Sequence, residues 1–260
     1  MRNSVLRFSV MVGLFALMFC GSTKSSTVFA QSANDPDDPA DVLDAFIEAL
    51  GGEMTLVGVE TLSAKAKYSG WTEGTTTFSF KDGKRMGRST YTGTNEYIEY
   101  HDGEKWIEKD PDSSAKEPVD KGSIQENDTM FDLPTDALRL RKQADLLEVV
   151  PKEEFEDCDY AHCVCLRLKD DKEMNIHRYF NADTGLMECV ERWIDSAEVD
   201  GRKMRIRYYD FQYEESEGIM FLKKSRRTTG ADSFLNVEYS DFEVDQPIDD
   251  SVFDIEFDDD

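Results

Sequence analysis

Basic residues are scarce in this chain, which has 30 Lys and Arg against 55 Asp and Glu and a formal net charge of −25 at pH 7. A surface this acidic repels nucleic acid phosphates and anionic lipid surfaces. The charge therefore excludes nucleic acid as a partner. It carries no information about the fold.

The common catalytic signatures are absent as well. The sequence contains no Gly-x-Ser-x-Gly elbow, no phosphate-cradling glycine loop and no His-Glu-x-x-His zinc helix. Its three histidines, His101, His162 and His177, are each embedded in a strand-like pattern, where a core or surface role is usual. We therefore predict that the protein is not an enzyme and needs no cofactor.

Long apolar runs are limited to Val10–Phe19, which is too short to span a bilayer. Arg2 and Arg7 precede this run. A cleavage-site-like segment ending in the small residue Ala30 follows it at residues 28–30, and we expect cleavage after Ala30. This order predicts a cleaved signal peptide over residues 1–30. The mature chain is then periplasmic or secreted, without stable membrane insertion.

Cysteines are few, and one of the five, Cys20, lies within the signal peptide. The large Phe19 occupies the position where a lipidation motif has a small residue. We therefore expect Cys20 to be removed with the signal peptide and not to be lipidated. The mature chain keeps four candidates for disulfide bonds, Cys158, Cys163, Cys165 and Cys189. Three pairings are possible, although two cysteines two positions apart on one strand face are not expected to pair with each other. Their spacing matches no common zinc pattern, so we predict no metal site.

Helical signals occur in two places. After a polar, flexible lead-in over residues 31–38, Asp38 and Pro39 can start a helix, and Gly51-Gly52 can end it. Its apolar residues recur at helical spacing, which is typical of a helix that lies over a sheet. A second helix is predicted over residues 134–149 as a crossover that covers the sheet.

Most of the remaining chain alternates between apolar and polar residues, as strands do. The predicted strands are 62–68, 75–80, 85–91, 96–100, 105–108, 162–168, 175–180, 186–193, 203–213, 219–228 and 234–244. The apolar phase changes near Tyr208-Tyr209, which indicates a β-bulge and a bent strand. The predicted fold is mainly β (α+β), a single curved antiparallel sheet that forms an incomplete barrel over residues 39–255, followed by an acidic tail at 256–260.

The triplet Asp183-Thr184-Gly185 occurs in aspartic proteases and is the strongest catalytic lead in the chain. Such proteases need two triplets that meet, and this chain has one. Asp and Gly are also what the tip of a β-hairpin requires. We therefore interpret the triplet as the turn between strands 175–180 and 186–193.

Several short segments resemble the periplasmic lipoprotein-carrier superfamily of Lol-type carriers and their exported relatives. These segments are Glu48–Gly52, Leu56–Leu62, Asp102–Trp106, Tyr179–Met187, Gly218–Lys224 and Pro247–Phe253. The resemblance implies an incomplete antiparallel barrel whose concave apolar face is covered by helices and holds acyl chains.

On this basis we expect an exported, non-enzymatic protein that binds a lipid, a lipoprotein acyl chain or another hydrophobic ligand. The candidate lining residues are Phe78, Phe80, Ile98, Trp106, Ile206 and Phe211. The alternative is a structural or interaction protein of the cell envelope, whose cavity is filled by its own side chains and whose acidic surface binds a partner.

Overall fold

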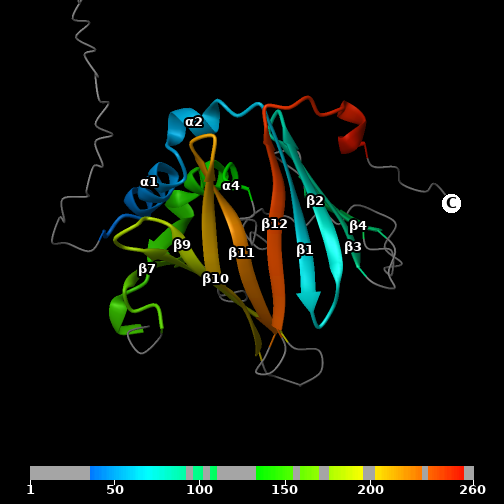
Figure 1. The fold of residues 1–260 in the computed structure, drawn as a ribbon. Helices are drawn as coiled ribbons and strands as arrows, with labels where there is room; N and C mark the ends of the chain where they lie inside the picture. Colours follow the sequence, from blue (N-terminus) through cyan, green and yellow to red (C-terminus); the bar gives the residue numbers. More distant parts are fainter. Residues whose placement is uncertain are drawn as a thin grey trace, which may run out of the picture. The chain divides into compact units, whose positions relative to one another are not determined.

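Twelve antiparallel strands form one sheet in the computed structural model, in the order β5-β4-β3-β2-β1-β12-β11-β10-β9-β8-β7-β6 (Figure 1). The structure describes residues 36–91, 96–101, 106–109, 133–154, 159–169, 176–195, 203–229 and 234–254. Within these residues β5 and β6 are the two edges and do not pair with each other. The sheet is therefore not closed, which confirms the predicted incomplete barrel.

The strands of the first half are β1 (Thr61–Gly70), β2 (Gly74–Lys81), β3 (Lys84–Tyr91), β4 (Glu96–His101), β5 (Trp106–Lys109) and β6 (Leu147–Val149). Those of the second half are β7 (Cys163–Leu168), β8 (Ile176–Asn181), β9 (Met187–Asp195), β10 (Lys203–Ser216), β11 (Ile219–Thr229) and β12 (Phe234–Val244). Every predicted strand is present with nearly the predicted bounds. The sequence patterns did not reveal β6.

The first predicted helix is confirmed as α1 (Pro39–Ala49). The Asp38 side chain accepts a hydrogen bond from the Ala40 N–H, and Gly51 and Gly52 follow with φ of 129° and 89°. These left-handed values favour glycine and end the helix. A short helix, α2 (Glu53–Val57), then leads into β1.

The second predicted helix is shorter than expected. Helix α4 spans Asp136–Arg141, a 3₁₀ turn covers Ala144–Leu146, and Leu147–Val149 forms β6 against β7. Leu147 pairs with Leu168 and Val149 with Leu166, so the last three residues of the predicted helix form a strand. Tertiary pairing thus overrides the local helical pattern there.

The predicted bulge in β10 is confirmed. Its register against β11 shifts between Tyr209 and Gln212, and Asp210 between them has φ of 55°. A bulge adds a residue to one strand and bends it. The bend curves the long β10–β11 ribbon, visible in Figure 1.

The two faces of the sheet differ in what covers them. We call the inner face the one on which α1 and α4 lie; it carries the main core cluster, which includes Leu43, Leu62, Phe180 and Phe221. The outer face carries two smaller clusters, one around Cys165 and Tyr179 and one around Met86 and Phe253. Alternation along each strand separates the two sets.

Several predictions fall outside the described residues. They concern the signal peptide over residues 1–30, the acidic tail at 256–260, Cys158 and the side chain of Trp106. Within the described ranges, every helix is too short or too polar to cross a membrane.

Candidate ligand-binding face

The inner face is apolar where α1 and α4 cover it. Helix α1 turns Val42, Leu43, Phe46 and Ile47 toward the sheet, and all four are buried. The Phe46 ring contacts the ring of Phe180 on β8 edge to face, with the centroids 5.2 Å apart. This contact holds the helix against β8, the third strand from the β6 edge of the sheet, since edge-to-face aromatic pairs add to the energy of buried area.

A small cavity lies between these helices and the sheet, with a volume of about 20 Å³. Its walls come from α1, from the segment leading into α4, from α4 and from strands β8 to β11. The lining residues are Phe46, Leu50, Leu133, Pro134, Asp136, Ala137, Leu140, Arg178, Met187, Tyr213, Met220 and Leu222. The volume suits about one water molecule. Among the described residues, this cavity leaves no room for a larger molecule unless its walls move.

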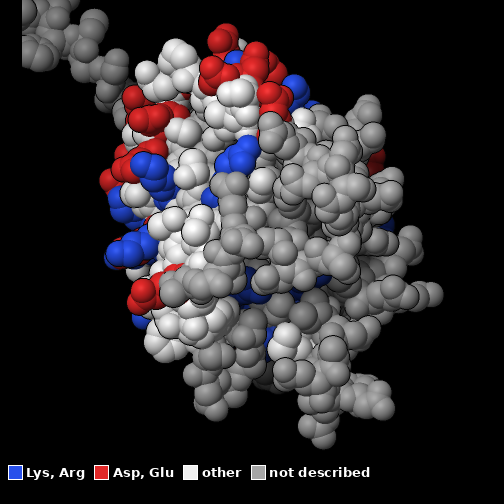
Figure 2. All heavy atoms as spheres, turned by 90° about the vertical axis from the view of Figure 1, so that its right-hand side faces the viewer, with Lys and Arg blue, Asp and Glu red and all other residues white. Residues whose placement is uncertain are grey.

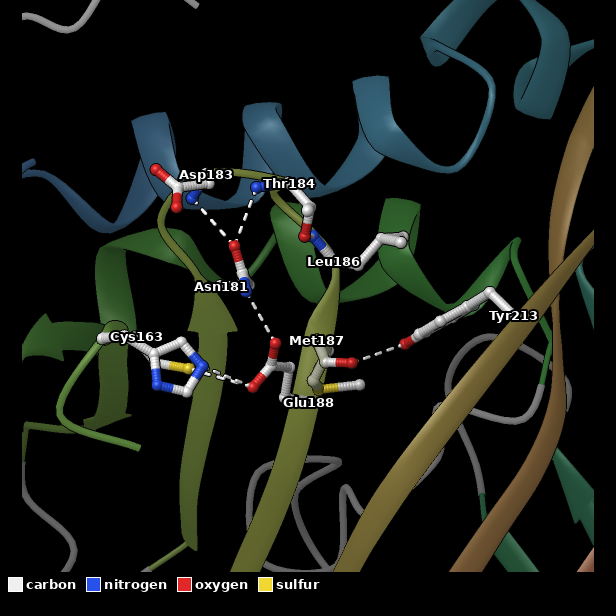
Figure 3. Close-up of polar contacts among 9 residues, drawn as sticks. Cys163, Asn181, Asp183, Thr184, Leu186, Met187, Glu188 and Tyr213 are labelled. Atoms are coloured by element: carbon white, nitrogen blue, oxygen red, sulfur yellow. Dashed lines mark hydrogen bonds and ion pairs between the residues drawn. The ribbon is translucent and has the colours of Figure 1, made fainter. Parts of the chain in front are cut away.

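Three polar groups stand among this apolar lining: Arg178, Asp136 and Tyr213. The Tyr213 hydroxyl donates to the Met187 carbonyl oxygen at 2.8 Å, which ties β10 to β9 (Figure 3). Burial raises the pKa of Tyr213. The phenol thus stays neutral and serves as a hydrogen-bond donor at the cavity wall.

Asp136 anchors the start of α4 in the interior. Its Oδ2 accepts a hydrogen bond from the Leu133 N–H at 3.0 Å. Its carboxylate also lies 4.0 Å from the guanidinium nitrogens of Arg85 on β3 and Arg139 on α4. Both Asp136 and Arg85 are buried. The Asp136 carboxylate thus links α4 electrostatically to β3, which lies in the other half of the sheet from β8 and β9.

A second ion pair joins the two covering helices to each other. The Arg141 guanidinium on α4 donates to both carboxylate oxygens of Asp44 on α1, and the Arg141 Nη2 to Asp44 Oδ2 distance is 3.2 Å. This pair is exposed. A pair of this kind contributes at most about 1 kcal/mol, so the helices can separate there at small cost.

The predicted lining residues occupy other positions. Phe78 is buried in the main core, and Phe80 and Phe211 pack against it, on the sheet but away from the cavity. Ile206 is buried and does not line the cavity either. Ile98 lies in the outer cluster with Phe253, because it pairs with Arg88, whose guanidinium reaches the C-terminal segment. A role of these residues in ligand binding stays a prediction.

The cavity residues were missed because they come from helices, from the segments that flank them and from four different strands. Leu133, Pro134 and Ala137 belong to the α4 region, and only tertiary packing places them against Met220 and Leu222. The apolar spacing of 134–141 was the available signal. It identified a covering helix without indicating which strand it covers.

The Asp183-Thr184-Gly185 triplet forms the turn of the β8–β9 hairpin, as predicted. The Asn181 side-chain oxygen accepts hydrogen bonds from the N–H groups of Asp183 and Thr184, both at 2.8 Å (Figure 3). Gly185 has φ of 73° and lies against the Ala45 carbonyl of α1. The triplet thus shapes the hairpin and docks it on α1.

The three described cysteines are thiols and do not form disulfides with one another. All three are buried on the outer face, in the cluster that also contains Val150, Tyr160 and Tyr179. The outer face of this region is therefore packed around sulfur atoms. The sequence alone had offered these positions as disulfide candidates.

Comparisons with known proteins give structural likenesses only, since no protein-family model and no curated protein matches the chain. A LolA superfamily protein from Nitrosomonas europaea aligns over 85% of this chain and 99% of its own, with 12% identity and a TM-score of 0.48. A DUF1329 family protein from Desulfovibrio piger aligns over 84% and 98%, with 12% identity and a TM-score of 0.44. The lipoprotein LppX from Mycobacterium tuberculosis aligns over 81% and 97%, with 10% identity and a TM-score of 0.30.

Proposed function

We propose that the protein is an exported, non-enzymatic carrier that binds a hydrophobic ligand between the inner face of its sheet and the covering helices. The observation that carries the proposal is an unclosed sheet whose apolar inner face is covered by the short helices α1 and α4. The end of α1 is tied to β11 by a hydrogen bond from the Met220 N–H to the Leu50 carbonyl oxygen at 2.9 Å. Apolar surface on such a face offers about 25 cal/mol per Å² to a lipid tail. The resemblance of the sequence to lipoprotein carriers agrees with this function.

Binding requires the cover to move. Ligand cavities usually measure about 300–1,000 Å³, whereas the covered face leaves about 20 Å³. Helix α4 is only six residues long and is joined to α1 by the exposed Asp44–Arg141 pair. We expect the ligand to displace α4, which also requires the buried Asp136–Arg85 contact to open, so that Met220, Leu222 and their neighbours contact the ligand.

The small cavity also favours a second candidate, a structural or interaction protein whose inner face is permanently filled. Its partner would bind the charged surface. On the face shown in Figure 2, acidic side chains gather in the upper part, and basic side chains lie lower on the left and in the recessed centre. A basic partner would bind the acidic part and be released by salt.

Native mass spectrometry and organic extraction of the mature protein test the first proposal. We expect an extractable lipid, or uptake of a brominated fatty acid by the delipidated protein. In a Met220→Trp variant the new tryptophan lies at the cavity, so the brominated chain should quench its fluorescence. The matched control is Met54→Trp on the exposed side of α2, where quenching should not exceed that of the parent.

The outcomes separate the two candidates. Quenching specific to Met220→Trp supports the carrier. Equal quenching of both variants, or no uptake by a folded protein, overturns it. A salt-sensitive partner recovered with an empty protein supports the second candidate.

A further inference from the structure

The outer face brings three different metal-binding groups together at the hairpin end of β7, β8 and β9. Cys163 is the first residue of β7, His162 immediately precedes it, and Glu188 lies on β9. The imidazole nitrogen, the thiol sulfur and a carboxylate oxygen all lie within 4.8 Å of one another. In the part of the chain that the structure describes, no other three such groups converge.

A β-bulge directs Glu188 to this face. Tyr179 pairs with Cys189 and Phe180 with Met187, so Glu188 is the extra residue between two partners on β9. Met187 lines the inner cavity and Cys189 is buried in the outer cluster. In an unbulged strand the residue before Cys189 would point inward. The bulge instead presents the carboxylate beside Cys163, and bulges commonly re-aim functional side chains in this way.

The contacts among the three groups are short. His162 Nε2 lies 2.8 Å from Glu188 Oε2, and Cys163 Sγ lies 3.6 Å from the same oxygen. Ligands of a tetrahedral Zn²⁺ bound at 2.0–2.3 Å lie about 3.5 Å apart. Small side-chain rotations are therefore enough to place an ion between them. The mostly exposed His162 leaves a side open to water as a fourth ligand.

A neighbouring residue orients the carboxylate. Asn181 Nδ2 donates to Glu188 Oε1 at 2.6 Å, which leaves Oε2 directed at His162 and Cys163 (Figure 3). Asn181 is itself fixed, because its Oδ1 accepts the two N–H groups of the hairpin turn. Outer groups that hold a ligand in place in this way are typical of metal sites.

We propose that His162, Cys163 and Glu188 form a binding site for a divalent transition metal, with Zn²⁺ the best match. Sulfur, imidazole nitrogen and carboxylate oxygen together suit this ion. On binding, the Cys163 thiol gives its proton to solvent and becomes a thiolate. The thiolate and the Glu188 carboxylate then balance the two positive charges of the ion in a half-buried place. The site lies on the opposite face from the proposed ligand cavity and does not depend on that function.

Metal titration of the untagged mature protein, reduced and stripped with chelator, tests the site. We expect one equivalent of Zn²⁺ to bind with release of protons. Co²⁺ should bind at the same place and give the near-ultraviolet charge-transfer absorption of a cobalt–thiolate bond. Cys163→Ser should abolish that absorption, and His162→Gln and Glu188→Gln should weaken Zn²⁺ binding at least about tenfold.

Matched controls come from the same face. Cys189→Ser changes a buried thiol and His177→Gln changes an imidazole, and neither residue is one of the three proposed ligands. Both variants should keep the cobalt absorption and the Zn²⁺ affinity. Circular dichroism checks that each variant is folded. Absence of saturable binding, a cobalt band that survives Cys163→Ser, or a Cys163 found in a disulfide in the protein as purified would each overturn the proposal.

Discussion

Strands β7, β8 and β9 present opposite kinds of surface on their two sides. The inner side carries apolar groups such as Phe180 and Val190, which belong to the main core cluster under the covering helices. The outer side carries sulfur and aromatic groups such as Cys165 and Tyr179, together with polar contacts fixed by the hairpin. One side suits a ligand that replaces movable protein surface, and the other suits an ion that needs fixed groups. The same three strands can serve both because their side chains alternate.

The largest effect should come from the inner side. Phe180→Ala removes a fully buried ring that packs on Phe46 and should lower the free energy of unfolding by about 3–5 kcal/mol. Urea unfolding measures this loss. Phe234→Ala, at a half-exposed ring on β12, is the control and should cost less than about 1 kcal/mol. Equal losses would mean that the covered inner face is not the main source of stability.

The buried carboxylate of α4 should matter next. Asp136→Asn removes the negative charge from beside Arg85 and should destabilise the protein by about 3 kcal/mol, because breaking a buried ion pair on one side is costly. Asp44→Asn removes the exposed partner of Arg141 and should cost less than about 1 kcal/mol. The two variants are compared by thermal unfolding. If Asp136→Asn unfolds like Asp44→Asn, the buried group does not hold the cover.

The tip of the β8–β9 hairpin packs against α1, and a substitution at Gly185 tests that contact. A Cβ at Gly185 would lie 2.7 Å from the Ala45 carbonyl oxygen of α1, and the residue has φ of 73°. We expect Gly185→Ala to cost about 2 kcal/mol. Gly83 has φ of 77° with nothing within 4 Å of the same Cβ, so Gly83→Ala should cost about 1 kcal/mol. A difference in the reverse order would show that the hairpin does not press on α1.

The smallest effect concerns the outer side at alkaline pH. Burial raises the pKa of the Cys189 thiol to about 12, whereas an unfolded cysteine has a pKa of about 8.5. Between these values the unfolded chain loses its proton and the folded chain keeps it, so stability is full below about pH 8.5 and falls as the pH rises, by at most about 1.4 kcal/mol per pH unit. Urea unfolding between pH 8 and 10 should show a smaller loss for Cys189→Ala than for the parent. Parallel curves would contradict the assignment.

Much of this fold could be predicted because its signals are local. Asp38, Pro39 and the glycine pair after Leu50 mark α1 in the sequence, and the alternation of apolar residues gives nearly every strand. Strand β6 could not be predicted, because Leu147 and Val149 continue a helical pattern and only their pairing with β7 makes them a strand. In such cases the pairing strand, and not the local sequence preference, decides the secondary structure.

The candidate sites were less accessible to sequence reasoning. The cavity unites Phe46, Ala137 and Met220 from three separate segments, which no spacing rule connects. The proposed metal-binding groups come from β9 and from the start of β7 with the residue before it, and the bulge at Glu188 reverses the face that simple alternation assigns to it. A cysteine spacing pattern searched along the chain therefore found no zinc site. The residues that lie beside Cys163 are determined by the pairing register of β7, β8 and β9.

The two ends of the sheet have a consequence for how copies of the protein meet. Strands β5 and β6, at the edges, are the shortest of the twelve, with four and three residues. An edge strand exposes unpaired N–H and C=O groups that can template the addition of a foreign strand, and short edges offer few of them. The long strands β10 and β11 are paired on both sides. The extended backbone most able to recruit another chain is thus already occupied, which favours a protein that stays dispersed at high concentration.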